Sequence, residues 1–340
     1  MRQKDRKTAS FYAHREYIDG FFLLLVVAVA LAWLIPAIGA GDGTLSLSSI
    51  AGYGISVIFF FYGLKFNRNK LRSDISNWRL HTLIHLTTFI LFPLLILFIR
   101  PLFHGGSNNI LWLGIFYLAA LPSTVSSSVV MVSMANGNIP SAIFNASISS
   151  LIGVFITPLW ISLVLSGGAG ADTAALWPII WKLVLQVLLP VALGMALNRR
   201  WGSFAEKYNR KIRIFDQSII LLIVYTSFCA SFEHNVFAGF SPIAIIGCAA
   251  GMLLLFFVVF TIVGLACRRL KMNREDTITA QFCGSKKSLV HGAAMSKVIF
   301  AGHGGIGVLL LPIMLYHALQ LMVVSAMARK MSEYTEKVHK

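Results

Sequence analysis

The chain contains a series of apolar stretches, each long enough to cross a lipid bilayer. A transmembrane helix needs about 20 predominantly apolar residues. Stretches of this kind lie near residues 20–38, 47–66, 80–99, 140–165, 174–198, 215–232, 242–267 and 306–328. Helices satisfy their backbone polar groups internally, which lipid requires. The sequence therefore predicts an all-α polytopic membrane protein.

Composition and charge exclude a soluble domain and a protein that binds nucleic acid. Apolar residues make up 57% of the chain and charged residues only 12%, far from the balance of a soluble domain. The formal net charge of +16 is gathered in particular loops, which is typical of membrane topology and not of nucleic acid binding. No nucleotide-binding motif, catalytic constellation or metal-ligand spacing is present. We therefore expect neither enzyme activity, nor a cofactor, metal or nucleic acid partner.

Two further stretches are interrupted, so hydropathy alone does not assign them. Residues 110–135 contain the polar run Pro122–Ser128, and residues 276–300 contain Gly284–Ser288. If both cross the membrane, 24 Lys and Arg residues share the side of the two termini and only Arg100 lies opposite. Omitting either one places a basic stretch outside, against the positive-inside rule. We therefore expect ten transmembrane helices, with cytoplasmic tails at 1–19 and 331–340.

The interrupted spans occupy the same place, fourth of five, in each half of the chain. Since each half has an odd number of spans, the halves 1–165 and 174–330 have opposite orientations and form an inverted repeat. Matched broken helices in two inverted repeats are a pointer to a transporter site at the bilayer midplane. We expect the helix breaks at Pro122 and Gly284.

Two adjacent lysines, Lys286 and Lys287, lie near the middle of the second interrupted span. At the bilayer centre each lysine costs about 2.5 to 3.5 kcal/mol on the insertion scale. No Asp or Glu lies inside an apolar stretch to neutralise them. Buried ionisable groups tend to mark solute pathways, whereas the alternative is a structural role in which the ammonium donates to carbonyls of the broken helices. The two roles can also be divided between the pair.

Other polar residues near the interruptions are candidates for lining a site. A run of serines follows Pro122, and their alternative role is packing between helices. His291 follows Lys287 by four residues, so it is a candidate proton relay, with simple packing as the alternative. The full set of candidate binding residues is Ser126, Ser127, Ser128, Ser141, Asn145, Gly284, Ser285, Lys286, Lys287, Ser288 and His291.

Five motifs together resemble the bile acid:sodium symporter family, and in particular its divergent sodium/bile acid cotransporter 7-like branch. They are LPSTVSSSVV (121–130), SAIFNASISSLIGVFITPLW (141–160), VYTSFC (224–229), FCGSKKSL (282–289) and KVIFAG (297–302) followed by LPIMLYH (311–317). The resemblance implies a panel domain of spans 1, 2, 6 and 7 and a core domain of the other spans, in which broken helices 4 and 9 cross. It also implies the plasma membrane, here a bacterial inner membrane.

The resemblance also implies where sodium ligands would lie. In sodium-coupled members a Ser-Asn pair on span 4 corresponds to Ser127 and Ser128, and hydroxyls on span 5 correspond to Ser141 and Asn145. A Glu-x-Gly-x-Gln-Asn stretch on span 9 corresponds to 282–287, where Phe282 replaces the glutamate and two lysines replace the Gln-Asn pair. Replacing a carboxylate with an ammonium disfavours a hard cation, so sodium coupling is not expected and a proton is the favoured coupling ion.

These observations predict a secondary active transporter that moves an organic anion or other small polar solute by alternating access. The alternative is a non-transporting or channel-like regulator of ion homeostasis. The solute and the oligomeric state are left open.

The charge distribution generates a topology prediction. In a variant without native cysteines, new cysteines at Asn108 and Asn235 should react with a membrane-impermeant maleimide added to intact cells, because the ten-span arrangement places both outside. Cysteines at Glu206 and Asn273 should react only after permeabilisation. External labelling at Glu206 would contradict the ten-span arrangement.

Overall fold

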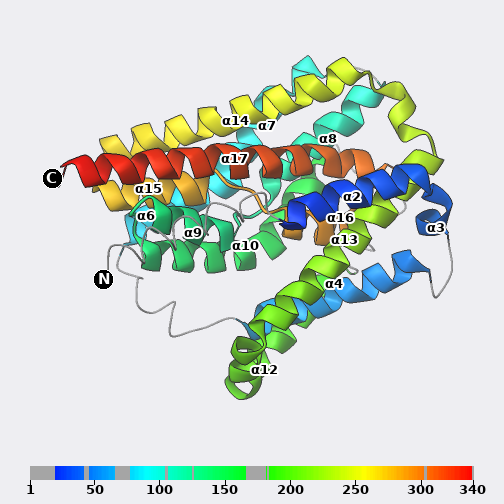
Figure 1. Cartoon of the computed structure of the whole chain (residues 1–340), viewed down its shortest axis with the longest axis horizontal. Helices are drawn as coiled ribbons and strands as arrows, with labels where there is room; N and C mark the ends of the chain where they lie inside the picture. The colour runs from blue at the N-terminus through cyan, green and yellow to red at the C-terminus, as the bar shows by residue number, and fades with distance from the viewer. Residues whose placement is uncertain are drawn as a thin grey trace, which may run out of the picture.

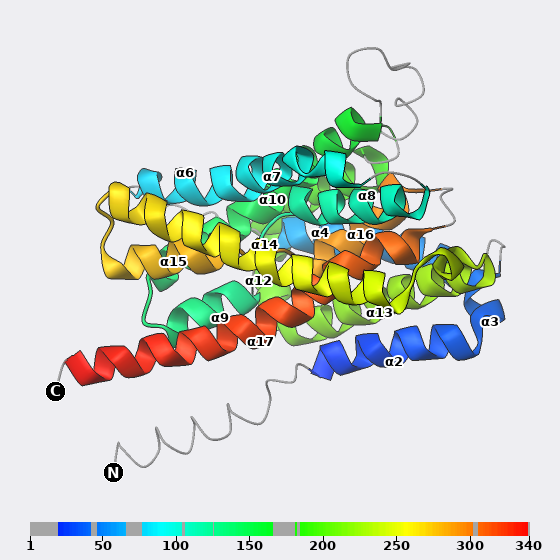
Figure 2. The same cartoon turned by 90° about the horizontal axis from the view of Figure 1, so that it is seen from above.

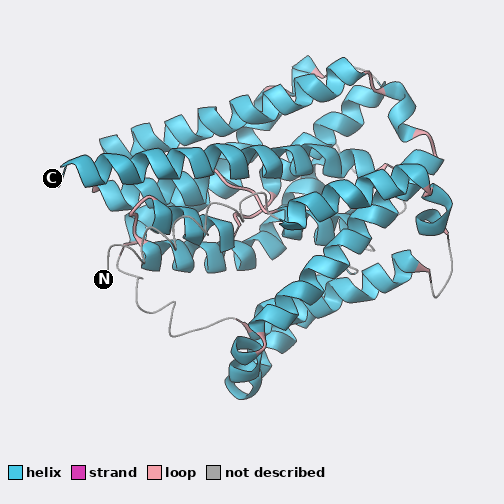
Figure 3. Cartoon of the chain, viewed as in Figure 1, coloured by secondary structure: helices cyan, strands magenta, loops and turns pink. Residues whose placement is uncertain are grey.

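A computed structural model describes residues 20–41, 46–65, 77–103, 106–124, 126–165, 181, 184–301 and 305–338. Every element of regular structure in these ranges is helical, as Figure 3 shows. The all-α prediction is confirmed for this part of the chain.

The first half of the chain supplies a series of helices that follow the expected spans. Their bounds are α2 (Gly20–Leu34), α3 (Pro36–Ala40), α4 (Leu47–Leu64), α6 (Trp78–Leu86), the π-helical turn η1 (Thr87–Leu91), α7 (Phe92–Phe98), the 3₁₀ turn η2 (Arg100–Leu102), α8 (Gly106–Ala120), α9 (Ser126–Met134) and α10 (Ile139–Leu165).

The second half continues in the same way. Its elements are the π-helical turn η3 (Val184–Leu188), α12 (Leu189–Lys207), α13 (Asn209–Glu233), the 3₁₀ turn η4 (Val236–Gly239), α14 (Pro242–Arg269), α15 (Arg274–Gly284), α16 (Leu289–Ile299) and α17 (Ile306–Val338). The expected span 174–198 lies partly outside the described residues.

Six helical stretches in the described part of the chain are long and apolar enough to cross a bilayer. They are Leu47–Leu64, Trp78–Leu102, Ile139–Leu165, Asn209–Glu233, Pro242–Arg269 and Ile306–Met331. Several large apolar side chains on these helices are exposed in the isolated chain, such as Tyr53, Phe98 and Ile243. Exposed apolar surface on helices of this length is typical of helices that face lipid. The protein is therefore a polytopic membrane protein.

Short polar side chains cap the starts of α14, α15 and α16. The side-chain oxygen of Ser241 accepts a hydrogen bond from the backbone of Ala244 at the start of α14, and Pro242 follows at the first helical position. Asn273 and Ser288 cap α15 and α16 in the same way. Both helices beside the second interruption therefore have their first turns fixed by local sequence.

The helices form two groups that contact each other along one side. We call α2, α3, α4, α12 and α13 the arm group, and α6 to α10 with α14 to α17 the bundle group. In Figure 1 the helices α4, α12 and α13 project obliquely from the bundle group. In Figure 2, seen from above, α2 runs beside α13 at one edge. The arm group meets the bundle group where α13 packs on α16 and α17, and where α4 packs on α16.

Close approach of α4 and α12 holds the arm group together. A Cβ atom on Gly63 would collide with the backbone carbonyl of Val191, and one on Gly194 would collide with that of Phe60. Small residues at such crossings let helix backbones come into direct contact in membranes. The Lys65 ammonium, at the end of α4, lies 3.5 Å from the carboxylate of Asp216 on α13.

Candidate functional site

Two interruptions divide expected spans into pairs of short helices. In the first, α8 ends at Ala120 and α9 begins at Ser126, with Pro122 between them. In the second, α15 ends at Gly284 and α16 begins at Leu289. We call residues 121–125 and 285–288 the first and second breaks.

The two breaks contact each other through reciprocal hydrogen bonds. The Ser123 hydroxyl of the first break donates to the carbonyl of Cys283 at 2.6 Å. The backbone N–H of Ser288 in the second break donates to the carbonyl of Pro122 at 2.9 Å. The first break therefore satisfies a carbonyl in the last turn of α15, and the second break satisfies a carbonyl of the first.

All four carbonyls from residue 119 to residue 122, at the end of α8, have donors from elsewhere in the chain. A helix leaves its last carbonyls without partners inside the helix, and lipid offers none. The Lys287 ammonium donates to the carbonyls of Ala119 and Leu121 at 2.6 and 2.9 Å. The Thr157 hydroxyl donates to the carbonyl of Ala120 at 2.7 Å. Ser288 occupies the fourth, that of Pro122.

Lys287 uses all three of its ammonium protons on backbone carbonyls. The third acceptor is the carbonyl of Thr88 at 2.7 Å, within the π-helical turn η1, whose altered hydrogen-bond pattern interrupts the i→i−4 series of the α-helix. The ammonium also lies 4.1 Å from the centre of the Phe92 ring, a cation–π contact. It therefore sits at the negative end of α8 with its charge compensated by dipoles instead of by a carboxylate.

Helix α17 fixes the backbone of the second break. Gln320 accepts from the Lys287 N–H and donates to the Lys287 carbonyl, both at 3.0 Å. The Tyr316 hydroxyl donates to the carbonyl of Ser285 at 2.5 Å. The backbone of the second break is thereby held against α17 by side chains one turn apart.

Ser149, Gly153 and Thr157 of α10 support the first break and the end of α8. Residues at intervals of four along this helix are buried and polar or small, namely Ser141, Asn145, Ser149, Gly153 and Thr157. Ser149 accepts from the N–H of Ser123 at 3.0 Å. A Cβ atom on Gly153 would lie 2.6 Å from the ring of Pro122, so only glycine leaves room for the proline.

Lys286 differs from its neighbour in how its charge is compensated. The side chain is fully buried, and its ammonium donates to the Ser127 hydroxyl at 2.9 Å. Ser127 in turn donates to Thr124, whose hydroxyl shares a 2.8 Å hydrogen bond with Ser128. Among the described residues Ser127 is the one hydrogen-bond partner of this ammonium. Two of its three protons therefore remain available to another acceptor.

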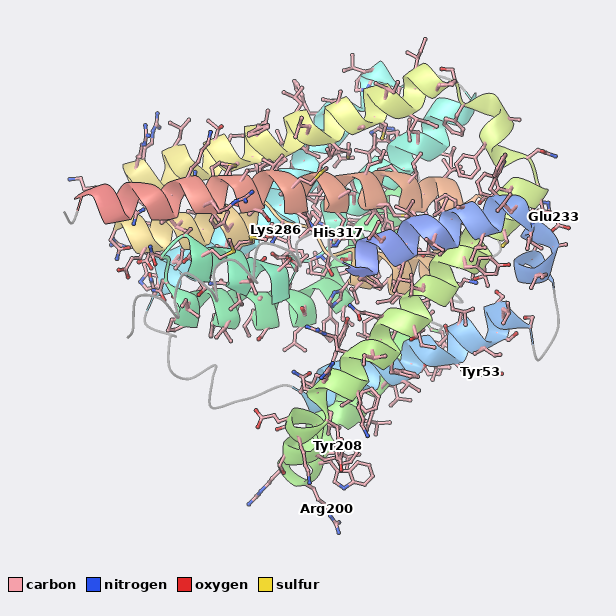
Figure 4. All side chains as sticks on the ribbon, viewed as in Figure 1. Tyr53, Arg200, Tyr208, Glu233, Lys286 and His317 are labelled. Carbon is pink, nitrogen blue, oxygen red and sulfur yellow. The ribbon has the colours of Figure 1, made fainter. Side chains whose placement is uncertain are left out.

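His317 lies close enough to Lys286 for the two to interact electrostatically, and Figure 4 labels both near the centre of the molecule. The ring Nδ1 of His317 is 3.0 Å from the amide nitrogen of Gln320. No Asp or Glu belongs to either break. The surroundings of Lys286 are therefore positive and rich in hydroxyl groups.

His291 lies where the bundle group meets the arm group. Its Nδ1 shares a 2.9 Å hydrogen bond with the Ser288 hydroxyl, and its ring stacks on Tyr62 of α4 with centroids 5.0 Å apart. Phe59 packs against the ring edge-on. The other ring nitrogen, Nε2, is buried and has no partner among the described residues.

Asn145 is separated from the lysines and belongs to a second polar cluster. Its amide nitrogen donates to the carbonyl of Ser141 at 2.7 Å and lies 2.9 Å from Nδ1 of His81 on α6. Its amide oxygen is buried without a partner among the described residues.

The structure brings most of the expected site residues together but not all. Ser127, Ser128 and the second break with its neighbours Gly284 and His291 lie around the contact between the breaks. Ser141 and Asn145 lie on the α6 side of α10, and the Ser126 side chain lies outside the described part. Sequence reasoning missed the partners Thr88, Thr157, Tyr316 and Gln320. The spacing of four on α10 was a readable signal for Thr157.

Asp276 is a further residue that sequence reasoning placed only at a segment end. Its carboxylate accepts from the side-chain amides of Asn77 and Asn138, each at 2.9 Å. The starts of α6, α10 and α15 are joined at this carboxylate. This cluster fixes the far end of the helix that leads into the second break.

Replacing Thr157 with valine should destabilise the protein by about 1 to 3 kcal/mol, because the carbonyl of Ala120 is left buried without a donor. Thr226→Val is the matched control. The Thr226 hydroxyl bonds to carbonyls of its own helix, so this control should change the thermal midpoint in detergent much less. Equal shifts would show that the Ala120 carbonyl finds another donor.

Lys287→Met should lower the thermal midpoint far more than Lys286→Met. The first change leaves three carbonyls unpaired, each at a cost of about 1 to 3 kcal/mol, whereas the second removes a single bond to a hydroxyl. Circular dichroism melting of both purified variants measures the difference. A larger loss from Lys286→Met would contradict the structural role assigned to Lys287.

Comparisons with known proteins show the family of the chain. The model of the SBF-like CPA transporter family matches residues 19–333. An uncharacterized protein of Pseudomonas aeruginosa, PA2026, is 38% identical over 312 residues, which cover 92% of each chain. The Escherichia coli protein named "Putative symporter YfeH" is 36% identical, with 94% of this chain and 95% of that protein covered. Sodium/bile acid cotransporter 7 of Rattus norvegicus is 28% identical over 91% of both. The family resemblance is confirmed, and the chain belongs to the SBF-like CPA transporter family.

Proposed function

We propose that the protein is a secondary active transporter that moves an organic anion or another small polar solute by alternating access. The observation that carries the proposal is the contact of two broken helices around a buried ammonium, Lys286, whose protons are only partly used. Broken helices in membranes expose backbone groups only where protein or a solute satisfies them. Membership of a transporter family supports transport and not enzyme activity.

The order of helices supports two inverted repeats, residues 1–165 and 174–330, within a ten-span topology. The breaks occupy equivalent places in the two halves and exchange hydrogen bonds. On this proposal the arm group corresponds to a panel domain and the bundle group to a core domain with crossing broken helices. Rocking of one against the other would alternate access. The protein would lie in the plasma membrane of a bacterium, with its basic loops and both termini on the cytoplasmic side.

The preference for an anion follows from the charges at the breaks. Lys286 and Lys287 bring positive charge into a region without a described carboxylate, and Lys287 spends its protons on carbonyls. Lys286 is therefore the residue proposed to bind the solute. The hydroxyls of Ser127, Ser128 and Thr124 would supply neutral contacts beside it.

Sodium is not the coupling ion on this proposal, although a relative is named a sodium/bile acid cotransporter. Lys287 already places a cation among the three carbonyls of Thr88, Ala119 and Leu121. A second cation nearby would be repelled in the low dielectric of the protein interior. A proton is the proposed alternative, carried by Lys286 or His291, because the protons of Lys287, the third candidate, are all held by carbonyls. In a sodium-coupled mechanism, the ligand would be the Asn145 amide oxygen, which accepts no hydrogen bond from the described part of the chain.

Uptake in proteoliposomes tests the proposal. A panel of radiolabelled organic anions, taurocholate among them, is first screened by thermal shift and then by counterflow, which a channel does not show. Lys286→Gln should reduce counterflow at least tenfold while the protein stays monodisperse. Arg210→Gln, an equal loss of charge at an exposed position, should leave it unchanged. Counterflow at the wild-type rate in Lys286→Gln would show that Lys286 does not bind the solute.

Replacing sodium with choline at fixed pH should not change the uptake rate, whereas varying pH from about 5.5 to 8.5 should change it. The Lys287 ammonium already occupies the carbonyls that a sodium ion would need. A proton is therefore the ion that we expect to be bound and released during transport. A saturable, millimolar requirement for sodium would restore a sodium-coupled mechanism and assign Asn145 to it.

A further inference from the structure

A cavity at one end of the bundle group lies apart from the breaks. It has a volume of about 350 Å³ and lies between the start of α15 and the later part of α17. Its walls are formed by Arg274, Thr277, Ile278, Gln281, Lys330 and Met331. This volume is within the range of small-molecule sites, about 300 to 1,000 Å³.

The cavity combines cations from two helices with an apolar floor. Arg274 is the first residue of α15, and its guanidinium donates to the carbonyl of Met331 at 2.9 Å, which fixes its position at the cavity wall. Lys330 stands on the opposite helix, exposed, and is paired with none of the described carboxylates. Ile278 is buried and supplies apolar surface. A ligand with an anionic head and an apolar body matches this arrangement.

None of the residues that line the cavity is acidic, while Glu333 and Glu336 follow Lys330 in the sequence of α17. Asp276 is occupied by the amides of Asn77 and Asn138 and does not line the cavity. The preceding turn carries further exposed cations, Arg268, Arg269 and Lys271. The only other acidic side chain in this turn of the chain, Glu275, also lies outside the lining.

The position of the cavity fixes the source of such a ligand. Arg329 and Lys330 directly follow the apolar part of α17, and Arg268 and Arg269 end the apolar helix α14. The cavity therefore lies at the border between the lipid interior and the aqueous phase. Basic pockets between helices at this level attract the head groups of anionic lipids.

We infer that the Arg274–Lys330 cavity binds the phosphodiester head group of an anionic phospholipid, with the start of an acyl chain against Ile278 and Met331. Arg274 would hold the phosphate with its planar fork of donors and Lys330 with a mobile point charge. The bound lipid would join α15, which leads into the second break, to α17, which fixes that break through Tyr316 and Gln320. The binding itself does not depend on the proposed transport function.

The test is lipid retention by the purified protein in detergent, measured by native mass spectrometry and by thermal shift. Phosphatidylglycerol should remain bound and raise the thermal midpoint, whereas phosphatidylcholine should do neither. The double variant Arg274→Gln/Lys330→Gln should bind phosphatidylglycerol about 10- to 30-fold more weakly, since each cation near the surface contributes about 1 kcal/mol. The matched control Arg268→Gln/Lys271→Gln removes the same charge outside the cavity and should keep the affinity.

Two more variants keep the test decisive if the double variant folds poorly. Lys330→Gln alone leaves the Arg274 bond intact and should weaken binding several-fold. Met331→Trp fills the cavity without changing charge and should weaken binding as well.

Three results would overturn the inference. If the control Arg268→Gln/Lys271→Gln lost as much affinity for phosphatidylglycerol, the lipid would be held by diffuse surface charge. If phosphatidylcholine were retained equally well, the cavity would bind acyl chains without recognising the head group. Displacement of the lipid by millimolar sodium phosphate would show a site for soluble phosphate.

Discussion

The ammonium of Lys287 and the carbonyls at the end of α8 depend on each other. A lysine at bilayer depth costs about 2.5 to 3.5 kcal/mol, and each buried carbonyl without a donor costs about 1 to 3 kcal/mol. Brought together, the cation supplies three donors, and α8, the first break and η1 supply one acceptor each. Neither could stay in the membrane interior alone. The reciprocal bonds of Ser123 and Ser288, and the support from α10 and α17, hold this contact in place.

Lys286 and Lys287 are adjacent and chemically identical, but the backbone around them gives them different roles. Three carbonyls surround the Lys287 ammonium, and each accepts one of its three protons. Lys286 reaches the hydroxyl of Ser127 and keeps protons for another acceptor. Because the second break is not helical, the directions of the two side chains are set by the bonds to Gln320 and Tyr316 and not by a fixed helical angle. Structure and solute binding can thus be assigned to separate residues.

The existence of the two broken helices was readable from the sequence, because the length of apolar stretches and the positive-inside rule both act on features visible in the sequence. Apolar length and the distribution of Lys and Arg indicated the two interrupted segments, and the lysine pair marked the second. The partners of Lys287 were not readable, because Thr88 lies 199 residues away in the chain and Ala119 lies 168 away. Hydropathy also gives no sign that a π-helical turn places the Thr88 carbonyl here. Asn145 was expected as a neutral ligand on span 5, and hydropathy gave no sign that His81 of α6 would lie 2.9 Å from its amide nitrogen.

Contacts within the bundle group restrict which parts of the molecule can move. Helix α15 is joined at its start to α6 and α10 through Asp276, and near its end Gln281 donates to Phe260 of α14. These bonds make it costly to shift α15 against its neighbours. The arm group is tied to α16 by fewer polar contacts, the Lys297 bond to Ser48 at 2.8 Å and the stacking of His291 on Tyr62. A stacked ring pair and a single flexible lysine can slide without leaving a helix end unsatisfied. The alternation proposed for transport is therefore expected at the surface between α4 and α16, while the contact between the breaks moves as one body with the bundle group.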